Sequence, residues 1–154
     1  MKRAIADSME QELIAYIAKA KDYFKQKITS VILFGSVARN EDSENSDIDI
    51  LIVCKKLPED WRKRDAISID IGRVSRNYGR AVHTTLATEE EIKFSVRDGA
   101  PLLLEIASAS RILQDNGFFT HQIEIFRKNM VTWKARKINR YMWEVPGLAV
   151  RARQ

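Results

Sequence analysis

The chain carries two stretches that decide the fold, VILFGSVAR at residues 31–39 and SDIDILIVC at residues 46–54. In the first, a run of β-branched and apolar residues ends at Gly35, which predicts a buried strand that stops at a turn. In the second, Asp47 and Asp49 open another apolar run, which predicts a second buried strand. Because alternate residues of a strand share a face, we expect both carboxylates to project from one face and Ile48, Ile50, Ile52 and Cys54 from the other.

The paired carboxylates predict a site for a divalent metal ion. Two acids on one face of an otherwise apolar strand repel each other and cost stability unless a cation lies between them. Carboxylate oxygens are hard ligands, which favour magnesium or manganese. The alternative interpretation is that Asp47 occupies a polar strand start and that Asp49 forms an ion pair with a nearby arginine or lysine.

Three residues at the end of the first strand, Gly35, Ser36 and Arg39, predict a phosphate site. A glycine lets a phosphate approach the backbone closely. A serine at the start of a helix offers its hydroxyl and free backbone amides, where the helix dipole favours anions. Arg39 follows Ser36 by three residues on the same face of that short helix, so it adds positive charge for phosphate oxygens.

Together, GSVAR at residues 35–39 and SDID at residues 46–49 resemble the motif of the minimal nucleotidyltransferases of the DNA polymerase beta superfamily. The resemblance covers residues 28–92 in the order of the elements. It implies an α+β, polymerase beta-like nucleotidyltransferase fold, in which a small mixed β-sheet is covered by helices.

The resemblance also implies a set of ligands and a reaction. The phosphates of a nucleoside triphosphate would lie on Gly35 and Ser36, and magnesium or manganese ions on Asp47 and Asp49. In this family two metal ions clamp the α-phosphate, one activating the attacking hydroxyl and one steadying the pyrophosphate. The implied activity is transfer of a nucleoside monophosphate, AMP from ATP, to a hydroxyl on a small molecule, a protein or an RNA end.

One position departs from the family's pattern. A third carboxylate on a later strand normally holds the activating metal, and aligning residues 82–90 with that strand puts His83 there. We interpret His83 as a base or a softer metal ligand, although histidine is a poor ligand for magnesium. The alternative is an ordinary strand histidine in a protein with reduced or no catalysis. Asp70, in the middle of a predicted helix, and His121 are interpreted as surface residues.

The histidine at position 83, in place of a third carboxylate, supports a second possible function. A weakly active or inactive, antitoxin-like subunit would bind a helical HEPN-type partner and have little turnover of its own. Small members of the family often lack a substrate-binding domain, so we expect such a partner or a homodimer to complete the site.

Apolar periodicity, caps and turn residues predict the order of the elements along the chain. The predicted segments are a helix over 4–25, strands over 28–34, 48–53, 80–87 and 110–114, a short helix and loop over 36–45, a helix over 60–78, a helix from 88 interrupted at 98–101, and a last helix over 118–143. The predicted apolar stripes are Met9, Leu13, Ile14, Tyr16, Ile17, Ala20 and Phe24 on the first helix, and Trp61, Ile67, Ile71 and Val74 on the helix over 60–78. This order predicts an α+β sheet covered by helices.

The 154 residues suffice for one domain, which we expect over 1–116, followed by a basic C-terminal helix and tail over 117–154. The net charge is +5, yet the tail has eight basic residues and two acidic ones, so it carries +6 and the first 116 residues carry −1. RNA is therefore a candidate partner of the tail, with a solvated helix face as the alternative.

The last predicted helix has five large apolar residues at helical spacing: Phe119, Ile123, Phe126, Met130 and Trp133. Exposed together, they would form a larger patch than monomers usually tolerate, so we expect them to pack on this domain or on a second subunit. The single cysteine, Cys54, ends an apolar run and is predicted to be core packing. Without an apolar run long enough for a membrane span and with an acidic N-terminal stretch, the sequence predicts a cytoplasmic protein.

Overall fold

A computed structural model describes residues 2–42, 46–73 and 80–148, with the backbone alone described over residues 2–9. The helices are α1 (Lys2–Phe24), the 3-10 turn η1 (Lys25–Lys27), α2 (Gly35–Ala38), α3 (Trp61–Gly72), α4 (Glu89–Asp98), α5 (Pro101–Ser108) and α6 (Phe118–Thr132). The strands are β1 (Ile28–Phe34), β2 (Ile48–Cys54), β3 (Val82–Thr88), β4 (Arg111–Asp115), β5 (Arg136–Asn139) and β6 (Met142–Glu144).

Four strands form one mixed sheet in the order β3-β2-β1-β4. β1 pairs antiparallel with both β2 and β4, whereas β2 and β3 run parallel. The parallel pair is consistent with the α3 segment between them, because parallel strands need a long crossover connection. β2, which carries Asp49, is thus an inner strand with a neighbour on each side.

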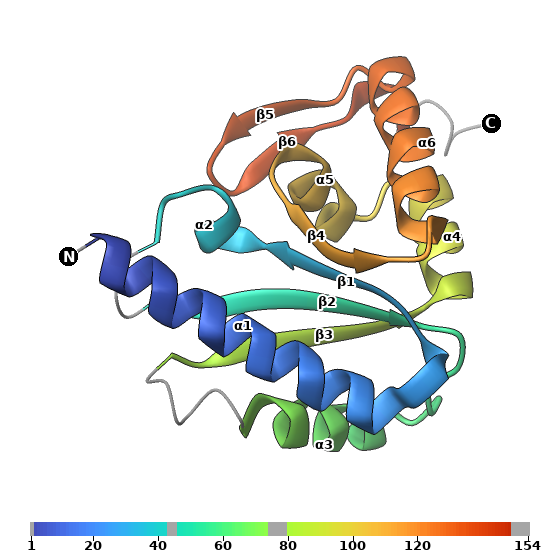
Figure 1. Ribbon diagram of the computed structural model, residues 1–154. Helices are drawn as coiled ribbons and strands as arrows, with labels where there is room; N and C mark the ends of the chain where they lie inside the picture. The colour runs from blue at the N-terminus through green and yellow to red at the C-terminus, as the bar shows by residue number, and fades with distance from the viewer. Residues whose placement is uncertain (1, 43–45, 74–79, 149–154) are drawn as a thin grey trace.

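Helices cover both faces of the sheet (Figure 1). The even positions of β2 from Ile48 to Cys54 pack in a buried cluster with α1 and α3, whereas Leu51 and Val53 belong to a second cluster with α4, α5 and α6. The predicted α+β fold and the predicted alternation along β2 are therefore confirmed, and Cys54 is core packing. Asp49 lies on the α5 and α6 side by the same alternation.

The two predicted apolar stripes on the N-terminal half are correct in part. Within the described side chains of α1, Leu13, Tyr16, Ala20 and Phe24 are buried, but Ile14 is 61% exposed. On α3, Ile71 is buried and Trp61, at the first position of the helix, is 66% exposed. Including Ile14 and Trp61 in the stripes was wrong, because each lies off the arc of its helix that meets the sheet. Met9, Val74 and the end of the predicted helix at 74–78 lie outside the described side chains.

The last helix is shorter than predicted, and the extension of it to Trp143 was wrong. α6 ends at Thr132, Lys134 has a left-handed φ of +55°, and the Ala135 amide donates to the Met130 carbonyl at 2.9 Å. That bond closes the helix in the manner of a Schellman end. β5 and β6 then form an antiparallel hairpin, whose turn is closed by the Tyr141 amide donating to Asn139 Oδ1 at 2.8 Å.

The apolar stripe of α6 packs on this chain's own core. Phe119, Ile123, Phe126 and Trp133 are buried in the cluster that contains Leu51, and Met130 packs against it. The expected burial of the stripe is confirmed, with the sheet of the same chain as its partner. None of the described helices is both long and apolar enough to cross a bilayer.

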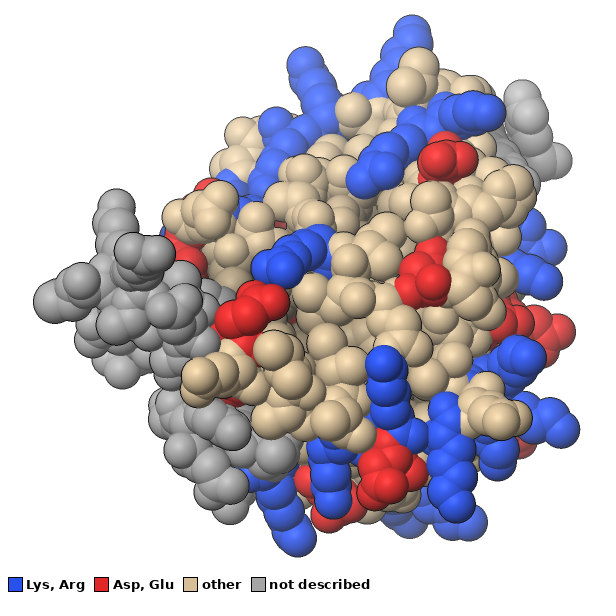
Figure 2. Space-filling model, viewed as in Figure 1, with Lys and Arg blue, Asp and Glu red and all other residues tan. Residues whose placement is uncertain are grey.

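Lys and Arg side chains project around the hairpin end of the molecule (Figure 2). The three basic residues of the hairpin are each paired: Arg136 with Glu144, Lys137 with Glu105 and Arg140 with Glu41. Much of the positive charge of the hairpin is therefore balanced locally, and RNA binding by the tail stays a prediction.

Candidate functional site

Asp49 lies at the point where the predicted phosphate turn meets the sheet. In the strand register it is opposite Phe34 of β1 on one side and His83 of β3 on the other. Gly35 follows Phe34 with a left-handed φ of +78°, and a Cβ on Gly35 would collide with the Asp49 carboxylate. Glycine suits this position, because φ is positive and a side chain here would displace the Asp49 carboxylate.

The two aspartates differ in environment. Asp47 precedes β2 and is exposed, whereas Asp49 is partly buried. Burial raises the pKa of the Asp49 carboxyl above its usual range, His83 opposes the rise, Asp47 adds to it and Arg39 opposes it. The raised pKa means that the ionised Asp49 lacks enough positive charge around it, which a bound cation would supply.

His83 contacts Asp49 across the parallel pair. Its Nδ1 is 3.6 Å from Asp49 Oδ1, and its side chain is 70% exposed. His83 also borders a hollow of about 310 Å³ between α3 and β3. The predicted position of His83 beside the aspartate strand is thus observed, while its role as a base or a ligand stays a prediction. Asp70 and His121 are outside this group, Asp70 next to Arg73 and His121 on an exposed position of α6.

The predicted phosphate turn, residues 35–39, is a single short turn of helix, α2, followed by Arg39. The Arg39 amide donates to the Gly35 carbonyl at 3.1 Å and the Glu41 amide to the Ser36 carbonyl at 2.9 Å, so the chain reverses tightly behind Ser36. The Arg39 side chain points to two carboxylates, with Nε 3.1 Å from Glu41 and Nη1 3.3 Å from Glu105. Arg39 therefore carries its charge at the end of the turn, and contact with a phosphate stays a prediction.

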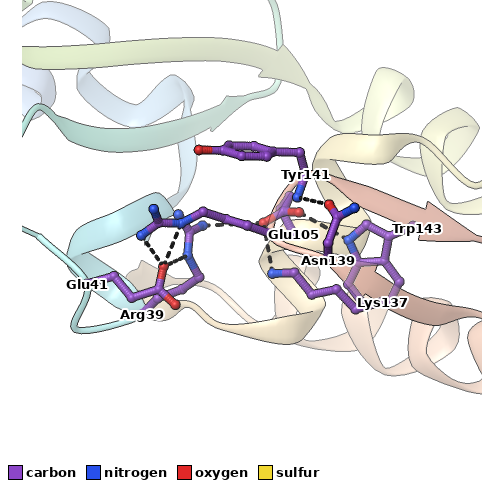
Figure 3. A network of polar contacts seen from close by, with 8 residues as sticks. Arg39, Glu41, Glu105, Lys137, Asn139, Tyr141 and Trp143 are labelled. Carbon is purple, nitrogen blue, oxygen red and sulfur yellow. Dashed lines mark hydrogen bonds and ion pairs between the residues drawn. The ribbon is translucent and has the colours of Figure 1, made fainter.

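A group of residues that the sequence analysis did not single out surrounds Arg39 (Figure 3). Its members come from the loop after α2, from α5 and from the hairpin: Glu41, Glu105, Lys137, Arg140 and Trp143. Glu105 carried one available signal, since it is the lone charge in the apolar run LLLEIA at residues 102–107. Glu41 lies two residues after Arg39. The three hairpin residues carried no signal, because they reach Glu41 and Glu105 only through the fold.

Asp47 and Asp49 fit a magnesium or manganese ion whose remaining ligands come from a bound substrate. Among the described residues, no group of three or more His, Cys, Asp or Glu side chains could hold a metal ion by itself. Asp47 and Asp49 supply two carboxylates, and the raised pKa of Asp49 marks a deficit of positive charge there. Magnesium is commonly held by one or two carboxylates together with substrate phosphates and water, so the two aspartates suffice if a triphosphate supplies further oxygens.

Comparisons with known proteins agree with this geometry. Residues 17–113 match the nucleotidyltransferase domain family. A candidate protein adenylyltransferase of Methanocaldococcus jannaschii is 30% identical over 105 residues, which cover 68% of this chain and 70% of that protein. A second one from the same organism is 47% identical over 45 residues, 29% of this chain and 46% of that protein.

A solved structure shares the fold. A chain from a crystal structure of a toxin–antitoxin with AMP-PNP superposes with a TM-score of 0.52 and 17% identity, over 77% of this chain and 90% of that one. The family match spans more than half of the chain and contains the glycine turn, both aspartates and His83. The chain therefore belongs to the nucleotidyltransferase domain family.

Proposed function

We propose that this protein transfers AMP from ATP to a hydroxyl group of a protein, with magnesium or manganese as the metal. The observation that carries the proposal is that the Asp49 carboxylate fills the space where a Gly35 side chain would lie, which brings together a turn suited to phosphate and a strand suited to a metal ion. Membership of the family supports nucleotide transfer. The names of the relatives as candidate protein adenylyltransferases support ATP and a protein acceptor.

In this proposal the residues of the turn bind the triphosphate. Gly35 brings the start of the turn close to Asp49, the Ser36 hydroxyl and amide would donate to phosphate, and Arg39 would add charge. Asp47 and Asp49 would hold the metal, which supplies positive charge to the phosphate oxygens and lowers the pKa of an attacking hydroxyl.

The reaction is an in-line displacement at the α-phosphorus. The acceptor hydroxyl oxygen forms a bond to the α-phosphorus while the bond from that phosphorus to the bridging oxygen breaks, and pyrophosphate leaves with the electron pair. The hydroxyl proton passes to a base, and we assign that role to His83, which borders both Asp49 and the hollow beside β3. General-base assistance of this kind contributes roughly 10²–10⁴-fold to a rate.

The first prediction tests the metal and triphosphate site by calorimetry with a non-hydrolysable ATP analogue and magnesium. Asp47→Asn combined with Asp49→Asn should weaken metal-dependent binding by roughly 10–100-fold or more, since even the loss of an outer partner of a metal ligand costs that much. Asp22→Asn combined with Asp98→Asn makes the same charge change at exposed positions and is the matched control. Unchanged affinity in the first double variant would show that the site is elsewhere.

Turnover is tested by incubating the protein with each labelled nucleoside triphosphate and magnesium, and by measuring pyrophosphate and label on protein or RNA. Label on protein from ATP, lost in the Asp47→Asn, Asp49→Asn variant, is the expected result. Label on RNA instead would mean that the protein does transfer a nucleotide but that its acceptor is RNA.

A second candidate function is supported by the histidine in place of a third carboxylate. A weakly active, antitoxin-like subunit would bind triphosphate on the same turn yet release little pyrophosphate, and would pair with a helical HEPN-type protein. The toxin–antitoxin chain that shares the fold supports this reading. Metal-dependent triphosphate binding without pyrophosphate release in the turnover assay would favour it over the enzyme.

A further inference from the structure

We infer that Glu105 is a positioning residue that orients Arg39 for the triphosphate and thereby makes the β5–β6 hairpin part of the nucleotide site. The inference rests on the proposed function, because it assigns Arg39 to phosphate. It goes further by extending the site to two segments of the chain, α5 and the hairpin, that the motif does not contain.

Glu105 lies between the phosphate turn and the hairpin (Figure 3). One oxygen, Oε2, accepts from Arg39 Nη1 at 3.3 Å and lies 3.8 Å from Lys137 Nζ. The other, Oε1, accepts from the indole Nε1 of Trp143 at 3.1 Å. A single carboxylate thus joins α2, α5, β5 and β6, and both of its oxygens are engaged.

A second carboxylate, Glu41, holds the opposite side of the guanidinium. Its Oε2 accepts from Arg39 Nε at 3.1 Å and from Arg140 Nη2 at 2.9 Å. Glu41 is exposed, and ion pairs between exposed side chains contribute little to stability. The Glu105 side chain is 26% exposed and has a neutral indole donor besides its cations, so it is the firmer of the two anchors.

The geometry links this network to the aspartates. Asp49 projects toward the face of the sheet that carries α5, and Arg39 ends the short turn whose first residue, Gly35, lies against the Asp49 carboxylate. The turn of the hairpin also lies next to α2, where Arg140 meets Glu41 (Figure 1). A shift of Arg39 would therefore change the electrostatics at the metal and phosphate site, and Glu105 limits that shift.

A positioning role has a specific kinetic signature. In the native protein, Glu105 and Glu41 hold the Arg39 side chain in place before the triphosphate binds. Without Glu105, Arg39 keeps only its contact with the exposed Glu41, so the triphosphate must immobilise the Arg39 side chain when it binds. That cost raises the dissociation constant and the KM for ATP by roughly threefold to tenfold. The kcat changes little, since the bound complex contains the same Arg39 contact.

The experiment is a double-mutant cycle in the full chain, read by calorimetry with AMP-PNP and magnesium and by steady-state kinetics with ATP. Glu105→Gln should weaken binding by the stated factor in the native background and have no further effect once Arg39 is Ala. Trp143→Phe, which keeps the ring and removes the indole N–H, should weaken binding by a smaller factor that also depends on Arg39. Glu144→Gln removes an ion pair with Arg136 on the same hairpin and should leave binding unchanged.

Two results would overturn the inference. One is an unchanged affinity in Glu105→Gln, with thermal unfolding showing that the variant is folded. The other is an equal loss with and without Arg39, which would mean that Glu105 acts by holding the fold. If Glu105→Gln does not fold, the Trp143→Phe cycle decides by the same criterion. Failure of the native chain to bind the triphosphate would instead refute the proposed function, so the two failures are distinguishable.

Discussion

In the proposed function, the chemistry of His83 determines how active the site is. It faces Asp49 at 3.6 Å from the neighbouring strand, where an imidazole supplies one nitrogen and a carboxylate would supply two oxygens. Magnesium prefers oxygen, so a histidine here favours proton transfer over metal binding. In the proposed site, two carboxylates would hold the metal, and His83 would act as the base beside them.

The corresponding prediction is that His83→Asp raises magnesium-dependent pyrophosphate release, on the order of tenfold, because a carboxylate both accepts a proton and adds an oxygen ligand. The measurement is the initial rate over a magnesium titration. His121→Asp, at an exposed position on α6, makes the same substitution away from the site and should not change the rate. A rate in His83→Asp at or below that of His83→Ala would contradict the assignment of this position.

The parts of the site that depend on local spacing could be predicted from the sequence. Gly35, Asp47 and Asp49 were selected from a strand that ends at a glycine and from a two-residue alternation. The strand before Gly35 and the alternation from Ile48 to Cys54 appear in the structure, whereas Asp47 precedes β2. The partner of Arg39 could not be predicted, because Glu105 is 66 residues away in sequence. Charge pairing at that separation depends on how α5 packs, which no local pattern specifies.

Among the elements, the junction between β4 and α6 depends on a single carboxylate. Asp115 accepts from Ser30 Oγ at 2.7 Å, from the Phe119 and Thr120 amides at 3.1 and 2.9 Å, and from Thr120 Oγ1 at 2.7 Å. It thus fastens the first turn of α6 to β1. Burial acts to raise the pKa of Asp115, but the hydrogen bonds from Ser30 and Thr120 outweigh it, so the pKa lies below its usual range.

We predict that Asp115→Ala lowers the free energy of unfolding by about 1–3 kcal/mol at pH 7, since it leaves several donors without their acceptor. A carboxyl whose folded pKa is depressed stabilises the protein above its unfolded pKa, and that contribution disappears as the pH falls through the folded pKa. The difference between Asp115→Ala and the native chain in urea unfolding should therefore shrink from pH 7 toward about pH 3. Asp98→Ala, at an exposed position of α4, is the control; an equal effect there or a difference that grows in acid would contradict the role of Asp115.

The hairpin shows why one element was predicted wrongly. The spacing of apolar residues correctly predicts a helix over Phe118–Thr132, but the residues that follow have no apolar stripe at helical spacing, so the predicted extension to Trp143 was wrong. Four exposed residues make up β5. The β5–β6 hairpin is held in place by ion pairs with Glu41 and Glu105, which lie elsewhere in the fold. Its own sequence therefore gives little indication that it forms strands.

At the scale of the whole molecule, the C-terminal segment completes the core on one face of the sheet. Phe119, Ile123, Phe126 and Trp133 are buried against β1, β2, α4 and α5, and the rings of Phe126 and Trp133 meet edge to face at 5.8 Å. Gly147 and Leu148 then close over Trp133, with the Gly147 amide donating to its carbonyl at 2.9 Å. The face of the sheet on which Asp49 projects is therefore formed with the help of residues more than 65 positions later in the chain.

The last prediction is that a chain ending at Asn116 cannot fold stably. Burying the four large side chains contributes roughly 6–12 kcal/mol in total. That sum is comparable to the whole net stability of a domain, which is about 5–15 kcal/mol, and the truncation also uncovers the side chains of β2 and α5 that face α6. The truncated chain should aggregate or show no cooperative thermal transition, whereas a chain ending at Leu148, which keeps the entire described core, should unfold like the native protein. Phe126→Ala tests the same packing in the intact chain and should lower the free energy of unfolding by about 3–5 kcal/mol in a urea titration. A soluble, cooperatively unfolding 1–116 fragment would refute the argument, because it would mean that the sheet can cover this face without α6.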